Sequence, residues 1–179
     1  MPKFLNLSYK ETKIVTNKDK EIFEWAFNNP SRRHKVLDKI TSSESSYEWA
    51  KRWPEDKDIM RDRINESGWA YKWAQMWPEE RHIMRERINS SYWAYYWAKS
   101  WPEDREIMRE RVVDSYWVFE WLTTWPEDKY IMKNRIKGPR WALQWIKNIG
   151  PDPDMLEICK KDEKIYREVF ELVLQGERK

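Results

Sequence analysis

The sequence predicts an all-α fold, a right- or left-twisted solenoid of stacked helical hairpins with a 24-residue repeat. Its 14 tryptophans fall into three series, and the interval within each series is 24 residues. The motif Trp-Pro followed by two acidic residues recurs at the same interval. Aromatic residues make up 16% of a chain whose mean hydropathy is only -1.02, so its apolar surface is concentrated at repeated positions. Such a period indicates a short supersecondary unit that buries its apolar face against neighbouring copies.

The repeated indoles are predicted to form a structural ladder, most of it buried between hairpins. The indoles recur together with prolines, alanines and acidic pairs. This pattern favours burial between hairpins over exposed rings on which bases would stack. The central copies contribute Trp49, Trp53, Trp69, Trp73, Trp77, Trp93, Trp97, Trp101, Trp117, Trp121 and Trp125 to this ladder.

The first helix of a representative repeat is predicted over residues 68–76. Trp69, Trp73 and Trp77 are spaced i, i+4 and i+8, which places three indoles near one face of a helix. Small alanines beside them allow a neighbouring helix to come close. Ser67, which recurs in phase in the next two copies, is the expected N-cap.

The second helix is predicted over residues 78–88 and begins at Pro78, because proline suits the first position of a helix and disfavours helical geometry in the residue before it. The acidic pair that follows is expected to complement the positive end of the helix dipole. Ile83, Met84 and Ile88 form a narrow apolar stripe on an otherwise charged surface. Each repeat is therefore expected to be a helical hairpin.

The repeat also predicts the domain organisation. We expect an N-terminal segment over residues 1–20, tandem hairpins over 21–150 and C-terminal capping helices over 151–179, all in one structural unit. Residues 1–16 are irregular in pattern, with a short extended segment expected around Ile14 and Val15. Apolar residues at helical spacing predict an amphipathic helix over about 162–175.

Two phases of the repeat differ from copy to copy and are expected to be exposed and to encode partner choice. The residues at these phases are Lys51, Gln75, Lys99, Thr123 and Lys147, and Arg52, Met76, Ser100, Thr124 and Asn148.

Repeated arginines give the main candidate for a binding site. Arg63, Arg87 and Arg111 lie beside the apolar stripe, where a guanidinium must be paired or stacked. One interpretation is structural: each arginine stacks on a tryptophan of the next hairpin or pairs with an acid across the repeat boundary. The other is that these arginines, with Tyr71 and Tyr95, hold an anionic ligand such as a nucleotide.

Several functions find little support. Duplex nucleic acid is an unfavourable partner, because every arginine-rich helix also carries acids. His34 and His82 occupy unrelated repeat phases, so no catalytic or metal-ligand set is predicted, and no cofactor is expected. The single cysteine, Cys159, excludes an intramolecular disulfide and is expected to be a small buried residue. No signal peptide or membrane span is predicted, which favours a cytoplasmic protein.

One resemblance is carried by Trp-Ala-Tyr-Lys-Trp-Ala followed by Trp-Pro-Glu-Glu and Ile-Met. Over residues 25 to about 150 the chain resembles the uncharacterised tandem WAYxYA/WPE helical-repeat proteins of phages and giant viruses. The resemblance implies a viral, bacteriophage origin and action in the host cytoplasm. It also implies counter-defence, by occupying a host protein or by sequestering a nucleotide signal.

The leading functional hypothesis is a non-enzymatic helical-repeat protein that binds a host or viral protein through variable positions on its hairpins. The alternative is a protein that binds or sequesters a nucleotide with arginines and aromatic residues. Nothing in the pattern predicts an oligomeric state.

Overall fold

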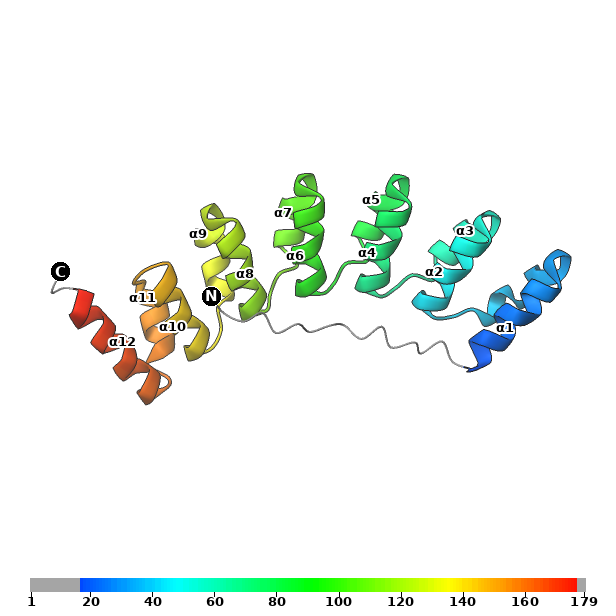
Figure 1. The fold of residues 1–179 in the computed structure, drawn as a ribbon. Coiled ribbons are helices and arrows are strands. Elements are labelled where there is room, and N and C mark those ends of the chain that lie inside the picture. Colours follow the sequence, from blue (N-terminus) through cyan, green and yellow to red (C-terminus); the bar gives the residue numbers. More distant parts are fainter. Residues whose placement is uncertain (1–16, 177–179) are drawn as a thin grey trace. The chain divides into compact units, whose positions relative to one another are not determined.

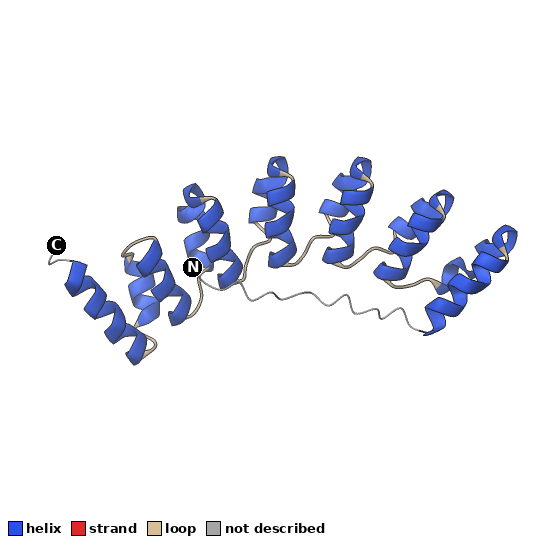
Figure 2. Ribbon diagram, in the orientation of Figure 1, coloured by secondary structure: helices blue, strands red, loops and turns tan. Residues whose placement is uncertain are grey.

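The computed structural model describes residues 17–176 and contains helices and loops, with no strand in that part of the chain (Figures 1 and 2). The prediction of an all-α fold built from successive helical hairpins is confirmed. The extended segment expected around Ile14 and Val15 lies outside the described residues. The chain divides into two compact units, Met1–Arg87 and Ile88–Lys179, where the repeat pattern predicts one, and each unit is described by itself.

The first unit contains three hairpins, in each of which an α-helix packs on a shorter helical segment that begins at a proline. In chain order its elements are α1 (Asn17–Asn28), η1 (Pro30–Lys39), α2 (Ser43–Arg52), η2 (Pro54–Asp56), α3 (Lys57–Arg61), α4 (Ser67–Met76), η3 (Pro78–Glu80) and α5 (Arg81–Arg85), where η marks a 3-10 helix.

The second unit continues the same pattern and ends in three α-helices. Its elements are α6 (Ser91–Ser100), η4 (Pro102–Asp104), α7 (Arg105–Arg109), α8 (Ser115–Thr124), η5 (Pro126–Asp128), α9 (Lys129–Met132), η6 (Lys133–Arg135), α10 (Pro139–Asn148), α11 (Pro153–Cys159) and α12 (Glu163–Gly176). The C-terminal helix expected over about 162–175 is thus confirmed as α12.

The turn inside each hairpin follows from the Trp-Pro pair. Trp77 leaves helical geometry at φ -128° and ψ 79° while its N–H still closes the helix on Trp73 O at 2.8 Å. Pro78 then begins a 3-10 turn that passes directly into α5. The second helix is shorter than predicted, because its α-helical part ends at Arg85 and Ile88 lies beyond it, although Ile88 is buried as expected.

The three tryptophan series differ in burial. Trp49, Trp73, Trp97 and Trp121 are fully buried, each beside an alanine or leucine that is buried with it. The other two series, represented by Trp69 and Trp77, are partly exposed. The prediction of a buried ladder therefore holds fully for these four indoles, whereas Trp25 of the same series is 38% exposed.

Each fully buried indole is anchored by the second acid after the proline. Trp73 Nε1 donates to Glu80 at 2.7 Å, and Trp97 Nε1 donates to Asp104 at 2.9 Å. Both carboxylates are buried, whereas the preceding acids, such as Glu79, are exposed. The acidic pair is thus more than a helix-start charge, since its second member satisfies the one polar atom of a core indole.

The serine expected as an N-cap has another role. Ser67 is the first residue of α4, one place after the N-cap residue Glu66, and its Oγ donates to Arg87 O in the loop after α5 at 3.4 Å. Its equivalent Ser91 reaches the loop after the next helix, where Oγ accepts from the N–H groups of Val113 at 2.9 Å and Asp114 at 3.2 Å. The N-cap prediction is wrong because the hydroxyl ties adjacent repeats together.

Cys159 is buried in α11, with Sγ 3.7 Å from Pro139 O. Burial raises the pKa of this thiol, because the thiolate would lose its hydration. The prediction of a small buried residue is confirmed.

Candidate functional site

The repeated arginines bind the backbone of the preceding hairpin. Arg87 Nη1 donates to Arg61 O and, at 2.7 Å, to Ile64 O, and Arg111 Nη1 donates to Ile88 O at 2.8 Å. Arg63 makes the equivalent bonds to Leu37 O and Ile40 O. Leu37 O and Arg61 O each also accept one backbone N–H, from Ile40 at 2.9 Å and from Ile64 at 3.1 Å, so the guanidinium supplies a second donor to carbonyl groups near the end of a helical segment.

The same guanidinium groups also approach acids of the preceding hairpin. Arg63 lies 3.6 Å from Asp38, and Arg87 lies 3.8 Å from Asp62. Burial lowers the pKa of Arg87, the Asp62 charge acting in the opposite direction. The closest partners are therefore carbonyl oxygens, which neither sequence-based interpretation named.

The two candidate tyrosines are placed differently from these arginines. Tyr71 is half-buried on α4. Tyr95 is buried, its hydroxyl 3.0 Å from Thr124 Oγ1 and its ring 5.5 Å from the ring of Trp117. In these positions the arginines and Tyr95 bridge successive hairpins. Their placement therefore has a structural explanation that does not require a bound nucleotide.

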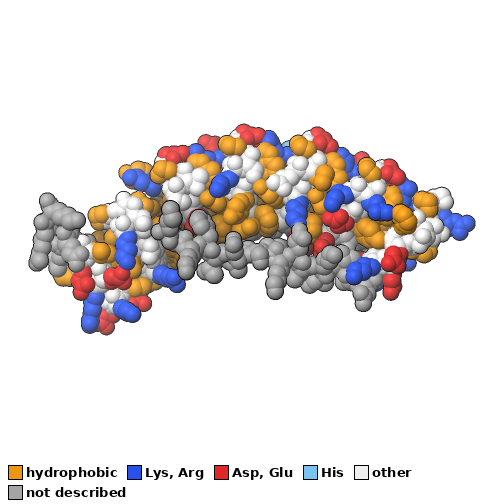
Figure 3. Space-filling view, viewed as in Figure 1, with side chains coloured by type: hydrophobic (Ala, Val, Ile, Leu, Met, Phe, Trp, Pro, Cys, Tyr) orange, Lys and Arg blue, Asp and Glu red, His pale blue; other side chains and the backbone are white. Residues whose placement is uncertain are grey.

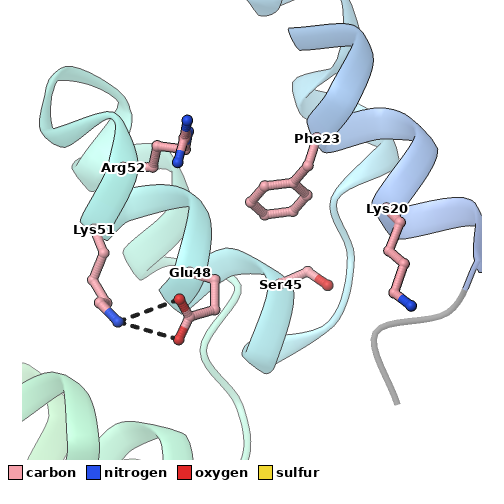
Figure 4. Close-up of a pocket in the computed structure, with 6 residues that line it drawn as sticks. All are labelled: Lys20, Phe23, Ser45, Glu48, Lys51 and Arg52. Atoms are coloured by element: carbon pink, nitrogen blue, oxygen red, sulfur yellow. Dashed lines mark hydrogen bonds and ion pairs between the residues drawn. The ribbon is translucent and has the colours of Figure 1, made fainter. Parts of the chain in front are cut away.

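A groove that sequence reasoning missed lies between α1 and α2 of the first unit (Figure 4). Phe23 of α1 and Ser45 of α2 point into it, and its volume is about 460 Å³. Its six lining residues are Lys20, Phe23, Ser45, Glu48, Lys51 and Arg52. We call this site the α1–α2 groove.

The groove exists because the copy of the repeat that begins with α2 lacks an indole at one phase. Ser45 occupies the phase at which the following copies carry Trp69, Trp93, Trp117 and Trp141. Trp69 packs on Tyr47 of the preceding hairpin, with ring centroids 5.4 Å apart. Phe23 is the counterpart of Tyr47 one repeat earlier. A serine cannot cover its ring, so the space that an indole fills in the next interface stays open.

The lining of the α1–α2 groove is predominantly cationic, with three basic side chains and one carboxylate. Lys51 Nζ pairs with Glu48 at 3.3 Å, and the Arg52 guanidinium lies 4.7 Å from the Phe27 ring centroid. Ser45 is only 2% exposed, and its hydroxyl has no hydrogen-bond partner among the described residues. A buried hydroxyl without a partner is costly, which makes it a good contact for a polar ligand.

A second candidate is an exposed group of rings on α6, α8 and α10 of the second unit. We define this aromatic surface as Tyr92, Tyr96, Tyr116, Trp117 and Trp141. Tyr92 and Tyr96 are each 36% exposed and Tyr116 is 45% exposed, although all three belong to large side chains that favour burial. Figure 3 shows hydrophobic side chains gathered over α6 and α8.

The rings of the aromatic surface contact one another. Tyr92 lies 4.7 Å from Tyr96 and 4.9 Å from Trp117, and Tyr116 lies 5.5 Å from Trp141, measured between centroids. Burial raises the pKa of Tyr96, and the neighbouring tyrosines act in the same direction. The rings therefore form one continuous patch whose members support each other's orientation.

The three tyrosines of the aromatic surface also lie at phases that vary between copies and that sequence reasoning did not single out. The phase of Tyr92 holds Glu44, Gly68, Tyr92, Tyr116 and Arg140, and the phase of Tyr96 holds Glu48, Lys72, Tyr96, Glu120 and Gln144. That variation was the signal that could have located this surface. The two phases that were predicted to be exposed are exposed in every copy.

Two further tests concern metals and membranes. Within residues 17–176 no cluster of three or more histidine, cysteine or acidic side chains is arranged to hold a metal ion. Among the helices of that same stretch, none combines the length and the apolar character that crossing a bilayer requires.

Comparison with known proteins yields no match among family models, curated proteins or solved structures. The viral origin and counter-defence role implied by the WAYxYA/WPE resemblance therefore stay predictions.

Proposed function

We propose that this protein is a non-enzymatic binding module that docks an extended, proline-rich segment of another protein on its aromatic surface. The observation that carries the proposal is the continuous group of rings on α6, α8 and α10, of which three tyrosines are exposed and Trp117 and Trp141 are half-buried. Contiguous exposed apolar patches are uncommon on proteins that act alone, and Tyr and Trp are enriched at binding hot spots.

The chemistry of the surface supports a proline-rich partner. Its five members are uncharged, and the indole N–H groups of Trp117 and Trp141 have no acceptor within the described chain, unlike that of Trp121, which is bound to Asp128 at 2.8 Å. A polyproline II segment presents flat rings that pack on aromatic faces and backbone carbonyls that accept from such N–H groups. Its low conformational freedom also reduces the entropy lost on binding.

The test is a fluorescence titration of the whole protein with a proline-rich peptide and with a glycine-serine peptide of equal length. We expect saturable binding of the proline-rich peptide only. Replacing Tyr92 and Tyr116 together with serine should weaken binding at least about tenfold, or about 1.4 kcal/mol.

Tyr130→Ser is the matched control, because Tyr130 is 73% exposed in the same unit but is not part of the aromatic surface. This variant should bind like the natural protein. Equal binding of both peptides, or an undiminished affinity of the double variant, would contradict the proposal.

A further inference from the structure

The α1–α2 groove combines three features that together define a ligand. It has an aromatic floor, a buried polar contact without a partner, and an excess of positive charge at its rim. It is also independent of the aromatic surface, which belongs to the other unit.

The size and shape of the ligand follow from the side chain that is missing. In the next interface the equivalent space holds the indole of Trp69, which packs on Tyr47 at 5.4 Å. The α1–α2 groove has Ser45 in place of that indole and Phe23 in place of Tyr47. A purine is also a planar five-six fused ring system, so it fits the same space and can stack on the Phe23 face.

The polar groups distinguish a purine from an apolar ring. The Ser45 hydroxyl can donate to or accept from a ring nitrogen or exocyclic group of the base. A purely hydrocarbon ring would leave it without a hydrogen-bond partner. The groove therefore favours a heteroaromatic ring over a phenyl group.

The net positive charge of the rim favours a ligand in which an anionic group is attached to that ring. Of the three cations, Lys51 is engaged by Glu48 and Arg52 lies over Phe27, whereas Lys20 has no ion-pair partner within the described chain. Lysine is a common point-charge ligand of phosphate. A phosphate group beside Lys20 would be attracted by the net charge of the rim.

We propose that the α1–α2 groove binds a purine nucleotide. The base stacks on Phe23 in the space of the missing indole and hydrogen-bonds to Ser45, and the phosphate is held by Lys20 with the other rim cations. Arg63, Arg87 and Arg111 take no part, because their guanidinium groups already hold backbone carbonyls.

The first arm of the test is isothermal titration calorimetry with four probes: AMP, adenosine, UMP and inorganic phosphate. AMP should bind most tightly, and each of the other three should bind at least about tenfold more weakly. Equal affinities for AMP and phosphate would reveal a simple anion site, and equal affinities for AMP and UMP would exclude an indole-shaped space. Either result, or no binding of AMP, overturns the proposal.

The second arm uses Ser45→Trp, which introduces the side chain that the following copies carry. It should abolish AMP binding while circular dichroism shows an unchanged helical content. Lys20→Ala alters an exposed side chain and should weaken AMP binding at least about tenfold without affecting folding. If Ser45→Trp does not fold, Lys20→Ala decides the question, and undiminished binding by Lys20→Ala overturns the proposal.

Trp69→Ser supplies the matched groove control, tested in a Ser45→Trp background. It opens the equivalent space between α2 and α4, but the rim there holds Glu44, Lys72, Gln75 and Met76 in place of the three cations and the acid. With one acid and one base, this rim is neutral, so the variant should not bind AMP. Binding equal to that of the natural protein would show that the cations are irrelevant and would overturn the proposal.

Discussion

Two neighbouring interfaces of the first unit, α1 on α2 and α2 on α4, share one polar framework but differ at one large side chain and in the charges at the rim. Trp49 Nε1 donates to Asp56 at 3.0 Å in the first hairpin pair, and Trp73 Nε1 donates to Glu80 at 2.7 Å in the second. A cation from the preceding hairpin reaches each carboxylate, Arg33 at 2.9 Å and Lys57 at 3.0 Å. The polar framework is thus the constant part of the repeat.

The difference lies at Ser45 and Trp69. Phe23 contacts Trp49 and Trp53 with centroids 5.3 and 5.9 Å apart, much as Tyr47 contacts its own two indoles, but only Tyr47 has a third, Trp69. The indole at the position of Trp69 is therefore not needed for hairpins to stack. A position that the scaffold can leave empty is one that the protein can use for binding.

The largest expected effect concerns the shared part of the two interfaces. Trp49→Ala and Trp73→Ala should each lower the free energy of unfolding by about 3–5 kcal/mol, because each removes a fully buried indole. Chemical denaturation measures this loss. Gln75→Ala, at an exposed variable position, should stay within about 0.5 kcal/mol. A small loss at only one of the two tryptophans would contradict the claim that the two interfaces share the same framework.

Trp69→Ser converts the second interface into a copy of the first. We expect it to lower the free energy of unfolding by about 2–3 kcal/mol, less than a fully buried tryptophan, because Trp69 is partly exposed. The same denaturation experiment applies. A loss as large as that of Trp73→Ala would mean that Trp69 is part of the essential core. That result would contradict the claim that hairpins stack without this indole.

Glu80→Ala tests the polar framework. It leaves the buried indole N–H of Trp73 without an acceptor, so we expect a loss of about 1–3 kcal/mol in the free energy of unfolding. Glu80→Gln keeps an acceptor and should lose less. Glu79→Ala is the neighbouring control and removes only an exposed acid that pairs with Lys57, so its loss should be well below that of Glu80→Ala. Equal losses for Glu79→Ala and Glu80→Ala would contradict the anchoring role.

Ser45→Trp makes the opposite conversion and has the smallest expected effect. Filling the groove should raise the free energy of unfolding by about 0.5–2 kcal/mol, because the indole covers Phe23 and the surrounding residues already form the frame for it. Thermal denaturation without added ligand measures the change. A lower melting temperature would indicate that the groove does not match the shape of the missing side chain.

The sequence predicts the scaffold better than the sites. Its period locates the hairpins, the Trp-Pro turn and the fully buried Trp73, because each depends on spacing and local geometry. It does not predict that Arg87 binds carbonyl oxygens, since every residue carries a carbonyl and only the fold selects Arg61 and Ile64. The groove has a signal in the sequence, Ser45 at a tryptophan phase, but its meaning depends on knowing that Phe23 lies opposite.

The most direct test of the account is a double-mutant cycle that joins Phe23→Ala and Ser45→Trp, measured by chemical denaturation. If the indole position opposite Phe23 is truly vacant, Phe23→Ala should cost about 0.5–1.5 kcal/mol more in the Ser45→Trp background than in the natural protein. The cycle of Tyr47→Ala and Trp69→Ser should show a coupling of similar size. Additive effects of Phe23→Ala and Ser45→Trp would contradict the claim that the groove occupies the position that an indole fills in the next interface.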